Sequence, residues 1–429
     1  MPSPVHAGRR WTGAAFAALL LLGAACSSDN KSTTASGSSG SSGSSSSSGP
    51  DLSALGTANA ATGSTITIGL MTDAGSGTLD AQSALVEQGA KIAVNYVNDY
   101  KGGVGTHKLD LFICQNKSTP AGAQDCANQF VEKKVSAVIY PYTGQGSAVP
   151  IITGAGIPLV IGTGSSTEEL TGAGTFILTG GYPGTLGAFA ADAKSQGYKK
   201  FAMIVIDVPA ATQGATALGN IVFKKAGVGY EVIPAAPGTA DLTAQLQQAV
   251  TDGADAIGVT GDVTFCTSFL QAYDTLALTQ AKYVIGTCND QSVVKAMPNA
   301  LKGARETTLT GSGPDDALYA AMVAKYGDSS IDPNPIKSSG ISNGVGTVMN
   351  FVSGLGSYTG DGSAASILAA YKGATGEIFG SGGLKFKCDG TAIPLLKSIC
   401  SSQFQMAVLN ADGTVASQTT VDAAPMYQS

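Results

Sequence analysis

The stretch Val160–Leu170, VIGTGSSTEEL, joins an apolar run of β-strand character to the start of a predicted helix. Glycine at this join lets a bound group approach the backbone, and the serines and threonines add hydroxyl donors. The first N–H groups of a helix are unpaired and carry partial positive charge, which suits a carboxylate or another anion. The stretch therefore predicts the edge of a binding site. The alternative is a capping box, in which Ser165 with Glu168, or Ser166 with Glu169, satisfies the helix itself.

Around this stretch, apolar runs of five or six residues alternate with longer segments of helical period. This repetition predicts an α/β fold, with parallel sheets covered by helices on both faces. The pattern starts at ITIGLM, residues 66–71, and restarts after TFILTGGYPG, residues 175–184, which predicts two doubly wound lobes. The strand before Val160–Leu170 ends in YPYTGQGS, residues 140–147. Two polar strand ends, one carrying the Thr143 hydroxyl, thus meet where ligands bind in open parallel sheets.

The N-terminus has the pattern of a targeting segment. Two arginines precede an apolar run at residues 14–25 that is too short to span a bilayer and ends in small residues. LGAAC, residues 22–26 at the end of this run, resembles the lipobox of bacterial lipoproteins, in which the cysteine, here Cys26, is acylated. We therefore expect residues 1–25 to be a lipoprotein signal peptide, with ordinary cleavage and release as the alternative. Residues 26–64 are rich in serine and glycine and are expected to form a flexible tether.

Composition disfavours several classes of function. The formal net charge is −6, and it becomes −8 when residues 1–25 leave with their two arginines, so the chain is a poor candidate for nucleic-acid binding. His107 is then the single histidine, and it is expected to lie on the surface. GxSxG occurs as GISNG at residues 340–344, but no apolar strand run precedes it as a nucleophile elbow requires, and the sequence has no metal-ligand spacing and no phosphate-binding loop. We expect no catalytic residue, no metal and no cofactor.

Six cysteines follow Cys26, and their even number in an exported chain indicates disulfides. The sequence alone allows several connectivities, of which neighbour pairing is the simplest. That pairing joins Cys114 with Cys126, Cys266 with Cys288, and Cys388 with Cys400.

The chain resembles the type I periplasmic binding proteins, specifically the branched-chain amino acid-type solute-binding lipoproteins of ABC transporters. The likeness covers roughly Thr65 to the C-terminus. It rests on ITIGLMTDAGSG at residues 66–77, QGAKIAVNYVNDYKGGVGTHKLDLFI at 88–113, GIPLVIGTGSSTEEL at 156–170 and GGLKFKCDG at 382–390.

The resemblance implies two lobes joined by three chain crossings, with the ligand held between the lobes. The crossings are expected near Gly180–Pro183, Leu309–Gly311 and Phe379–Gly383. Lobe 1 would comprise residues 65–181 and 310–380, and lobe 2 residues 182–309 and 381–429.

The resemblance also implies ligand contacts in lobe 1. Thr143 falls where the family has a hydroxyl residue that binds the ligand carboxylate. Gly164 and Ser166 match a backbone carbonyl and a threonine that hold the carboxylate and amino groups. Thr78 lies where an aromatic side chain often covers the ligand. Tyr142 either lines the site or packs in the core.

In lobe 2 the sequence departs from the family pattern. The family's acidic residue for the ligand amine falls on Cys288, and its usual tyrosine falls on Asp262. Asp262 is expected either to pair with a ligand amine or to cap its helix, and Asp207 has the same two alternatives. Ser165 and Tyr182 complete the predicted ligand contacts.

The resemblance therefore predicts an extracytoplasmic binding protein, lipid-anchored at the outer face of the cytoplasmic membrane, that delivers a small solute to the permease of an ABC importer. The expected solute is an aliphatic or branched-chain amino acid, or a related amide or carboxylate. A sensory ectodomain without transport is the main alternative, because the fold is shared and function resides in the site. A secreted hydrolase is the other alternative.

Overall fold

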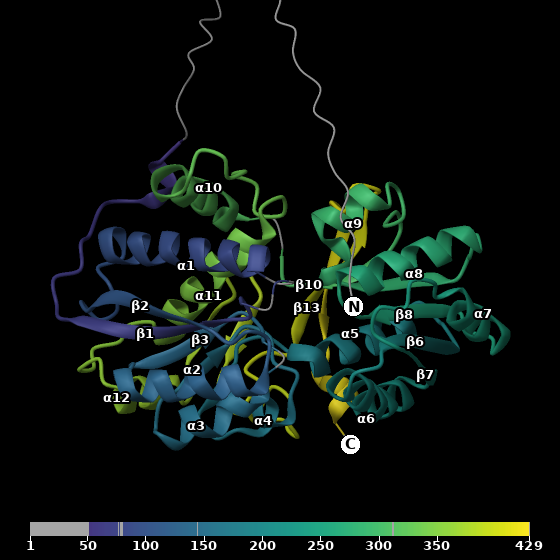
Figure 1. The fold of residues 1–429 in the computed structure, drawn as a ribbon, viewed down its shortest axis with the longest axis horizontal. Helices are drawn as coiled ribbons and strands as arrows, with labels where there is room; N and C mark the ends of the chain where they lie inside the picture. Colours follow the sequence, from purple (N-terminus) through teal and green to yellow (C-terminus); the bar gives the residue numbers. More distant parts are fainter. Residues whose placement is uncertain (1–50, 76, 78–79, 144, 311–312, 429) are drawn as a thin grey trace, which may run out of the picture. The chain divides into compact units, whose positions relative to one another are not determined.

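The computed structural model describes residues 51–75, 77, 80–143, 145–310 and 313–428 (Figure 1). The expected signal peptide, Cys26 and the tether as far as residue 50 lie outside the described residues, and so does Thr78. Within the described ranges, no helix is long and apolar enough to cross a membrane.

The first sheet has five parallel strands among the described residues, in the order β2–β1–β3–β4–β5 (Figure 1). The strands are β1 (Thr65–Thr72), β2 (Lys108–Gln115), β3 (Ala137–Tyr140), β4 (Leu159–Ile161) and β5 (Thr175–Ile177). The helices that belong to this lobe are α1 (Asp80–Tyr100), α2 (Pro120–Lys133), α3 (Val149–Gly154), α4 (Thr167–Thr171), α10 (Pro314–Tyr326), α11 (Ser339–Leu355) and α12 (Ala364–Tyr371). Successive side chains of a strand point to opposite faces, so Ile68 and Leu70 join the core formed with α1 and α11, whereas Gly69 faces Phe130 of α2.

Two glycines explain how closely α1 and α11 pack. A Cβ atom at Gly89 would lie 2.0 Å from the carbonyl oxygen of Ile341, and one at Gly344 would lie 2.0 Å from that of Val86. No side chain fits at these distances, so the close crossing of the two helices depends on glycine at both positions.

The second sheet contains seven strands in the described chain, in the order β14–β13–β10–β9–β8–β6–β7. They are β6 (Lys200–Ile206), β7 (Gly229–Ala235), β8 (Ala256–Thr260), β9 (Ala281–Ile285), β10 (Arg305–Thr308), β13 (Gln403–Leu409) and β14 (Val415–Asp422). The first five strands run parallel, and β13 and β14 are antiparallel additions. The associated helices are α5 (Gly181–Ser195), α6 (Pro209–Ala226), α7 (Thr243–Thr251), α8 (Val263–Thr275) and α9 (Gln291–Ala296). The predicted α/β class with two mainly parallel sheets is confirmed.

The last passage from the first lobe to the second lies later than expected. β11 (Thr375–Glu377) pairs with β12 (Lys385–Lys387), and Phe386 and Cys400 belong to the core that α1 and α11 share with the first sheet. The chain joins the second sheet only at β13. Residues 381–400 therefore pack with lobe 1, because their apolar side chains are buried there, and the boundary expected at residue 380 moves beyond Cys400.

The segment before β1 also differs from the expected tether. The 3-10 helix η1 (Ser53–Leu55) buries Leu55 in the first-lobe core. The backbone N–H groups of Asn59 and Ala61 donate to carbonyl oxygens at the end of α1. One apolar residue and these backbone hydrogen bonds thus order residues 51–64, although their composition is that of a linker.

Three disulfides join neighbouring cysteines in the described residues, and this confirms the simplest of the predicted pairings. They are Cys114–Cys126, Cys266–Cys288 and Cys388–Cys400.

Candidate functional site

The polar groups of the first lobe gather where its strands end. Asp73 follows β1, Asn116 follows β2, Thr143 follows β3, and Ser165 and Ser166 follow β4. The strands are parallel, so their carboxyl ends share one side of the sheet. We call these five residues the first-sheet edge.

A hydrogen-bond network connects the first three residues of this edge. The Oδ1 atom of Asp73 accepts from Nδ2 of Asn116 at 2.7 Å and from Oγ1 of Thr143 at 3.0 Å. The Thr143 oxygen itself accepts from Asn116 at 3.1 Å and from the backbone N–H of Gln145 at 3.3 Å. Thr143 is fully buried, and its single hydroxyl proton points to Asp73. A ligand carboxylate, which Thr143 was predicted to bind, would therefore have to compete with Asp73 for this proton.

The electrostatic state of Asp73 follows from this setting. Burial raises the pKa of its carboxyl group, while the hydrogen bonds from Asn116 and Thr143 act in the opposite direction. Two donors to one oxygen are the pattern expected around an ionised carboxylate.

The other part of the edge is a capping box. Ser166 precedes α4, and its hydroxyl oxygen accepts from the backbone N–H of Glu169 at 3.2 Å. In return, Oε2 of Glu169 accepts from the backbone N–H groups of Ser165 at 2.9 Å and Ser166 at 3.0 Å. The capping alternative considered for this stretch is what the structure contains, in the pair Ser166 and Glu169.

Glu169 is fully buried and reaches a second partner. Its Oε1 atom accepts from the hydroxyl of Tyr140, the last residue of β3, at 2.8 Å. Burial raises the pKa of Glu169, and the hydrogen bonds from Ser165, Ser166 and Tyr140 oppose that rise. The side chain thus links the ends of β3 and β4.

Tyr142 is the exposed member of this region. It is 53% exposed, although large apolar side chains are usually buried. Its pKa is raised first by burial around the hydroxyl and then by the negative charges of Asp73 and Glu169, and a hydrogen bond with the Ser165 side chain lowers it. Tyr142 therefore stands beside both acidic groups with its ring accessible, and its contact with a ligand stays a prediction.

Tyr182 lies where the chain first passes to the second lobe. Its backbone N–H donates to the carbonyl oxygen of Gly164 at 3.1 Å. Its hydroxyl oxygen is buried and has no hydrogen-bond partner of good geometry among the described residues, and the same holds for the Thr260 hydroxyl at the end of β8. Burial raises the pKa of Tyr182 to about 12, and the nearby Thr260 hydroxyl opposes the rise. The two hydroxyls thus lie near each other, and neither makes a hydrogen bond of good geometry with a described residue.

The remaining predicted contacts of the second lobe have other uses in the structure. Asp262 is exposed and caps α8, accepting from the backbone N–H of Phe265 at 2.8 Å, which is the capping alternative. Asp207 is exposed and accepts from the Thr212 hydroxyl at 3.0 Å. Cys288 is fully buried in its disulfide, so its sulfur offers no group to a ligand.

His107 is half-buried rather than fully exposed. Its Nε2 atom lies 3.1 Å from the carbonyl oxygen of Gly360, and its Nδ1 atom lies 3.1 Å from the Ser64 hydroxyl. The ring therefore joins two surface segments. No group of three or more His, Cys, Asp or Glu residues suited to a metal ion occurs among the described residues.

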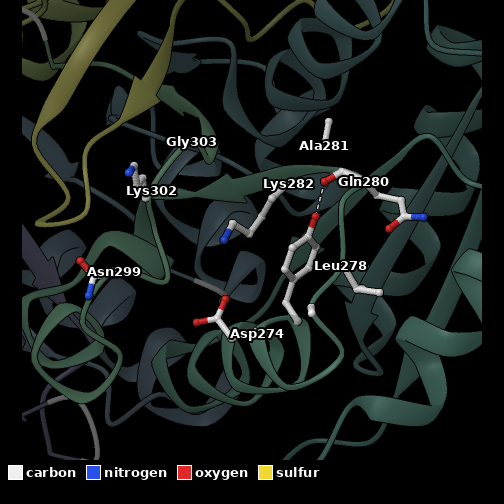
Figure 2. A pocket seen from close by; sticks show the side chains of 10 residues that line it. Asp274, Leu278, Gln280, Ala281, Lys282, Asn299, Lys302 and Gly303 are labelled. Atoms are coloured by element: carbon white, nitrogen blue, oxygen red, sulfur yellow. Dashed lines mark hydrogen bonds between the residues drawn. The ribbon is translucent and has the colours of Figure 1, made fainter.

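Two pockets lie away from the first-sheet edge. One, of about 330 Å³, is lined by residues around the start of β9, including Tyr273, Asp274 and Lys282 (Figure 2). Lys282 is buried, donates to the carbonyl oxygen of Ala300 and lies 4.7 Å above the Tyr273 ring. The other pocket, of about 590 Å³, lies beside α10. The first pocket is at the amino end of its strand, opposite to the position of ligands in parallel sheets.

Residues 65–395 match the family model for periplasmic binding proteins. The chain belongs to this family. The match covers most of the chain and includes the whole first-sheet edge. A comparison with curated proteins finds no match.

Solved structures show the same fold at low identity. The branched-chain amino acid transporter substrate-binding protein LivJ from Streptococcus pneumoniae, in complex with isoleucine, is 20% identical, with a TM-score of 0.65 over 83% of this chain and 99% of that protein. A fatty acid ABC transporter substrate-binding protein from Thermomonospora curvata is 15% identical, with a TM-score of 0.66 over 85% and 93%. A solute-binding protein from Rhodopseudomonas palustris, in complex with 3,4-dihydroxybenzoic acid, is 17% identical, with a TM-score of 0.62 over 84% and 98%. At these identities the likeness establishes the fold alone.

Sequence reasoning missed two residues of the edge, Asp73 and Asn116. Both directly follow a strand of the first sheet, and that position was the signal that could have found them. The polar strand ends of β1 and β2 deserved the same weight as those of β3 and β4, since all four end on one side of the sheet.

Proposed function

We propose that this protein is an extracytoplasmic solute-binding lipoprotein of an ABC importer. The observation that carries the proposal is the family match across residues 65–395, which includes the whole first sheet and the five parallel strands of the second. The structural neighbours support it, because one is a branched-chain amino acid transporter substrate-binding protein and another is a fatty acid ABC transporter substrate-binding protein. The expected solute, an aliphatic or branched-chain amino acid or a related amide or carboxylate, stays a prediction.

In this proposal the solute contacts the first-sheet edge on one side and the second lobe on the other. Tyr142 supplies an accessible ring, and the unpaired hydroxyls of Tyr182 and Thr260 supply hydrogen bonds from the second lobe. A solute that contacts both lobes favours the closed arrangement, because only differential affinity moves such an equilibrium. A micromolar dissociation constant needs about −8 kcal/mol, which a few buried hydrogen bonds and some apolar area can provide after ordering costs.

The partners follow from this role. The loaded protein would present its solute to membrane permease subunits, and acylated Cys26 would hold it at the outer face of the cytoplasmic membrane. Residues 27–50 would serve as the spacer. The proposed mechanism needs neither a cofactor nor a metal.

Solute binding is tested with the full mature chain, purified with its native N-terminus. Thermal-shift screening against amino acids, amides, amines and small carboxylates should find at least one class that raises Tm, and calorimetry should then give micromolar affinity or tighter. If no small solute of any class stabilises the chain, the proposal is wrong.

Transport is tested separately in the source cells. Cross-linking of the membrane-bound protein should capture a permease subunit, and deletion of the gene should abolish uptake of the identified solute. Solute binding with unchanged uptake would favour a sensory ectodomain instead.

A further inference from the structure

The first-sheet edge supplies its own carboxylates. The backbone N–H groups of Ser165 and Ser166 already donate to Glu169, and the hydroxyl proton of Thr143 is already directed to Asp73. The two backbone donors and the Thr143 hydroxyl of this edge are thus engaged, whereas the Ser166 hydroxyl accepts from Glu169 and keeps its own proton. A ligand carboxylate would have to displace an internal carboxylate and would then lie beside its negative charge.

Asp73 keeps acceptor capacity for a ligand. Both hydrogen bonds that it accepts through its side chain in the described structure end on Oδ1, from Asn116 and Thr143. Its Oδ2 atom receives no hydrogen bond from a described residue, and Asp73 is only half-buried. A carboxylate whose one oxygen is anchored by two donors presents the other oxygen in a fixed direction.

The charge around the edge is negative. Asp73 and Glu169 both raise the pKa values of Tyr140 and Tyr142 through their charge. No lysine or arginine of the described chain is among the groups that shift the pKa of either acid. Lys117, which follows Asn116, is exposed and lies against Gly75.

The second lobe provides an independent observation. The hydroxyls of Tyr182 and Thr260 are buried and lack partners among the described residues, and the backbone of Tyr182 is bonded to Gly164 beside the first-sheet edge. The two hydroxyls lie within reach of each other, so a small rotation can pair them, and either can give a solute at most a neutral hydrogen bond. Neither hydroxyl carries a charge. The exposed residues Asp207 and Asp262, at the ends of β6 and β8, are acidic and therefore do not favour a ligand carboxylate either.

From these contacts we infer that the solute binds the first lobe through an ammonium group that pairs with Asp73, and that solutes presenting a carboxylate there are rejected. This inference rests on the proposed solute-binding function and names the solute class. Asp73 selects by charge, Asn116 and Thr143 hold it in place, and Tyr142 packs its accessible ring against the solute, where a cation over an aromatic face is also favoured.

Matched pairs of probes test the inference on the full mature chain. Each pair keeps one carbon skeleton and exchanges an amine for a carboxylate: 3-methylbutylamine with 3-methylbutanoate, benzylamine with benzoate, and putrescine with succinate. Leucinamide with leucine tests whether an added carboxylate is tolerated beside the same amine. Calorimetry at neutral pH should give the amine member of the best-binding pair at least about ten-fold tighter binding, and leucinamide should exceed leucine by a similar factor.

The variant Asp73→Asn removes the charge and keeps the size of the side chain. The amine preference within the best pair should fall by at least about ten-fold. Asp110→Asn, on the exposed side of β2, removes one charge elsewhere on the same lobe and should leave the preference unchanged. If Asp73→Asn does not fold, the wild-type comparison within the pairs still decides.

The outcomes separate the two proposals. Carboxylates that bind as tightly as their matched amines would overturn the ammonium assignment, and leucine that binds as tightly as leucinamide would overturn the rejection of carboxylates. Both outcomes leave solute binding intact. An amine preference that survives Asp73→Asn would remove Asp73 from its assigned role. Absence of binding by every probe and by every member of the broader solute screen would refute solute binding itself.

Discussion

The carboxyl group of Glu306 is enclosed within the second lobe and predicts a pH-dependent stability. Glu306 lies on β10 between β9 and β13, and it is 4% exposed. Its Oε2 atom accepts from Nδ2 of Asn289 at 3.1 Å, and a Cβ placed at Gly286 would lie 3.4 Å from Oε1. Burial raises the pKa of Glu306 from 4.5 to about 7, and the hydrogen bond from Asn289 only partly opposes this rise.

The sign of the effect follows from proton binding. Below pH 4.5 the carboxyl group is protonated in both the folded and the unfolded chain. Between pH 4.5 and about 7 the unfolded chain loses the proton and the folded chain keeps it, so stability falls as pH rises. The full loss, reached above pH 7, amounts to about 3 kcal/mol, since each tenfold change in proton affinity is worth about 1.4 kcal/mol.

Glu306→Gln removes this titration while it keeps a polar side chain of the same size. Relative to the wild type, the variant should become more stable by about 3 kcal/mol as pH rises from 4 to 8. Denaturant unfolding at a series of pH values measures the difference, with Glu132→Gln on the exposed surface of α2 as the control for loss of one carboxylate. The difference in unfolding free energy between Glu306→Gln and the wild type should change with pH. If it changes no more than the difference for the control variant, the reasoning about burial is refuted.

Further substitutions test other parts of the fold. Ser166→Ala removes the hydroxyl that caps α4 and should cost about 1 kcal/mol in denaturant unfolding, and an unchanged midpoint would contradict the capping role. Cys288→Ser opens a disulfide with a sequence separation of 22 and should lower the unfolding free energy by about 3 kcal/mol, an effect that Cys266→Ser should match and the double variant Cys266→Ser/Cys288→Ser should not double. Arg305→Leu strips the buried Asp192 of a bidentate, partly buried ion pair and should cost about 3 kcal/mol, whereas the double change with Asp192→Asn should recover much of that loss.

Local patterns in the sequence were sufficient for the fold class. The alternation of short apolar runs with helical segments predicted two mainly parallel sheets, and neighbouring cysteines predicted the three disulfides. The capping box of Ser166 and Glu169 was also readable, as one of two alternatives. All these features depend on residues close together in the chain, where periodicity, spacing and cap chemistry act.

Long-range pairing decided the chemistry of the candidate site. Asp73 meets Asn116 and Thr143, which lie 43 and 70 residues further along the chain, and no local pattern states that the three share one network. This network directs the hydroxyl proton of Thr143 to Asp73, an acid of the chain itself. In our inference, the ligand group expected at the first-sheet edge therefore changes from a negative carboxylate to a positive ammonium group. The same reason explains why residues 381–400 were assigned to the wrong lobe: their local sequence resembles any short strand and turn, and only burial against the first-lobe core shows where they belong.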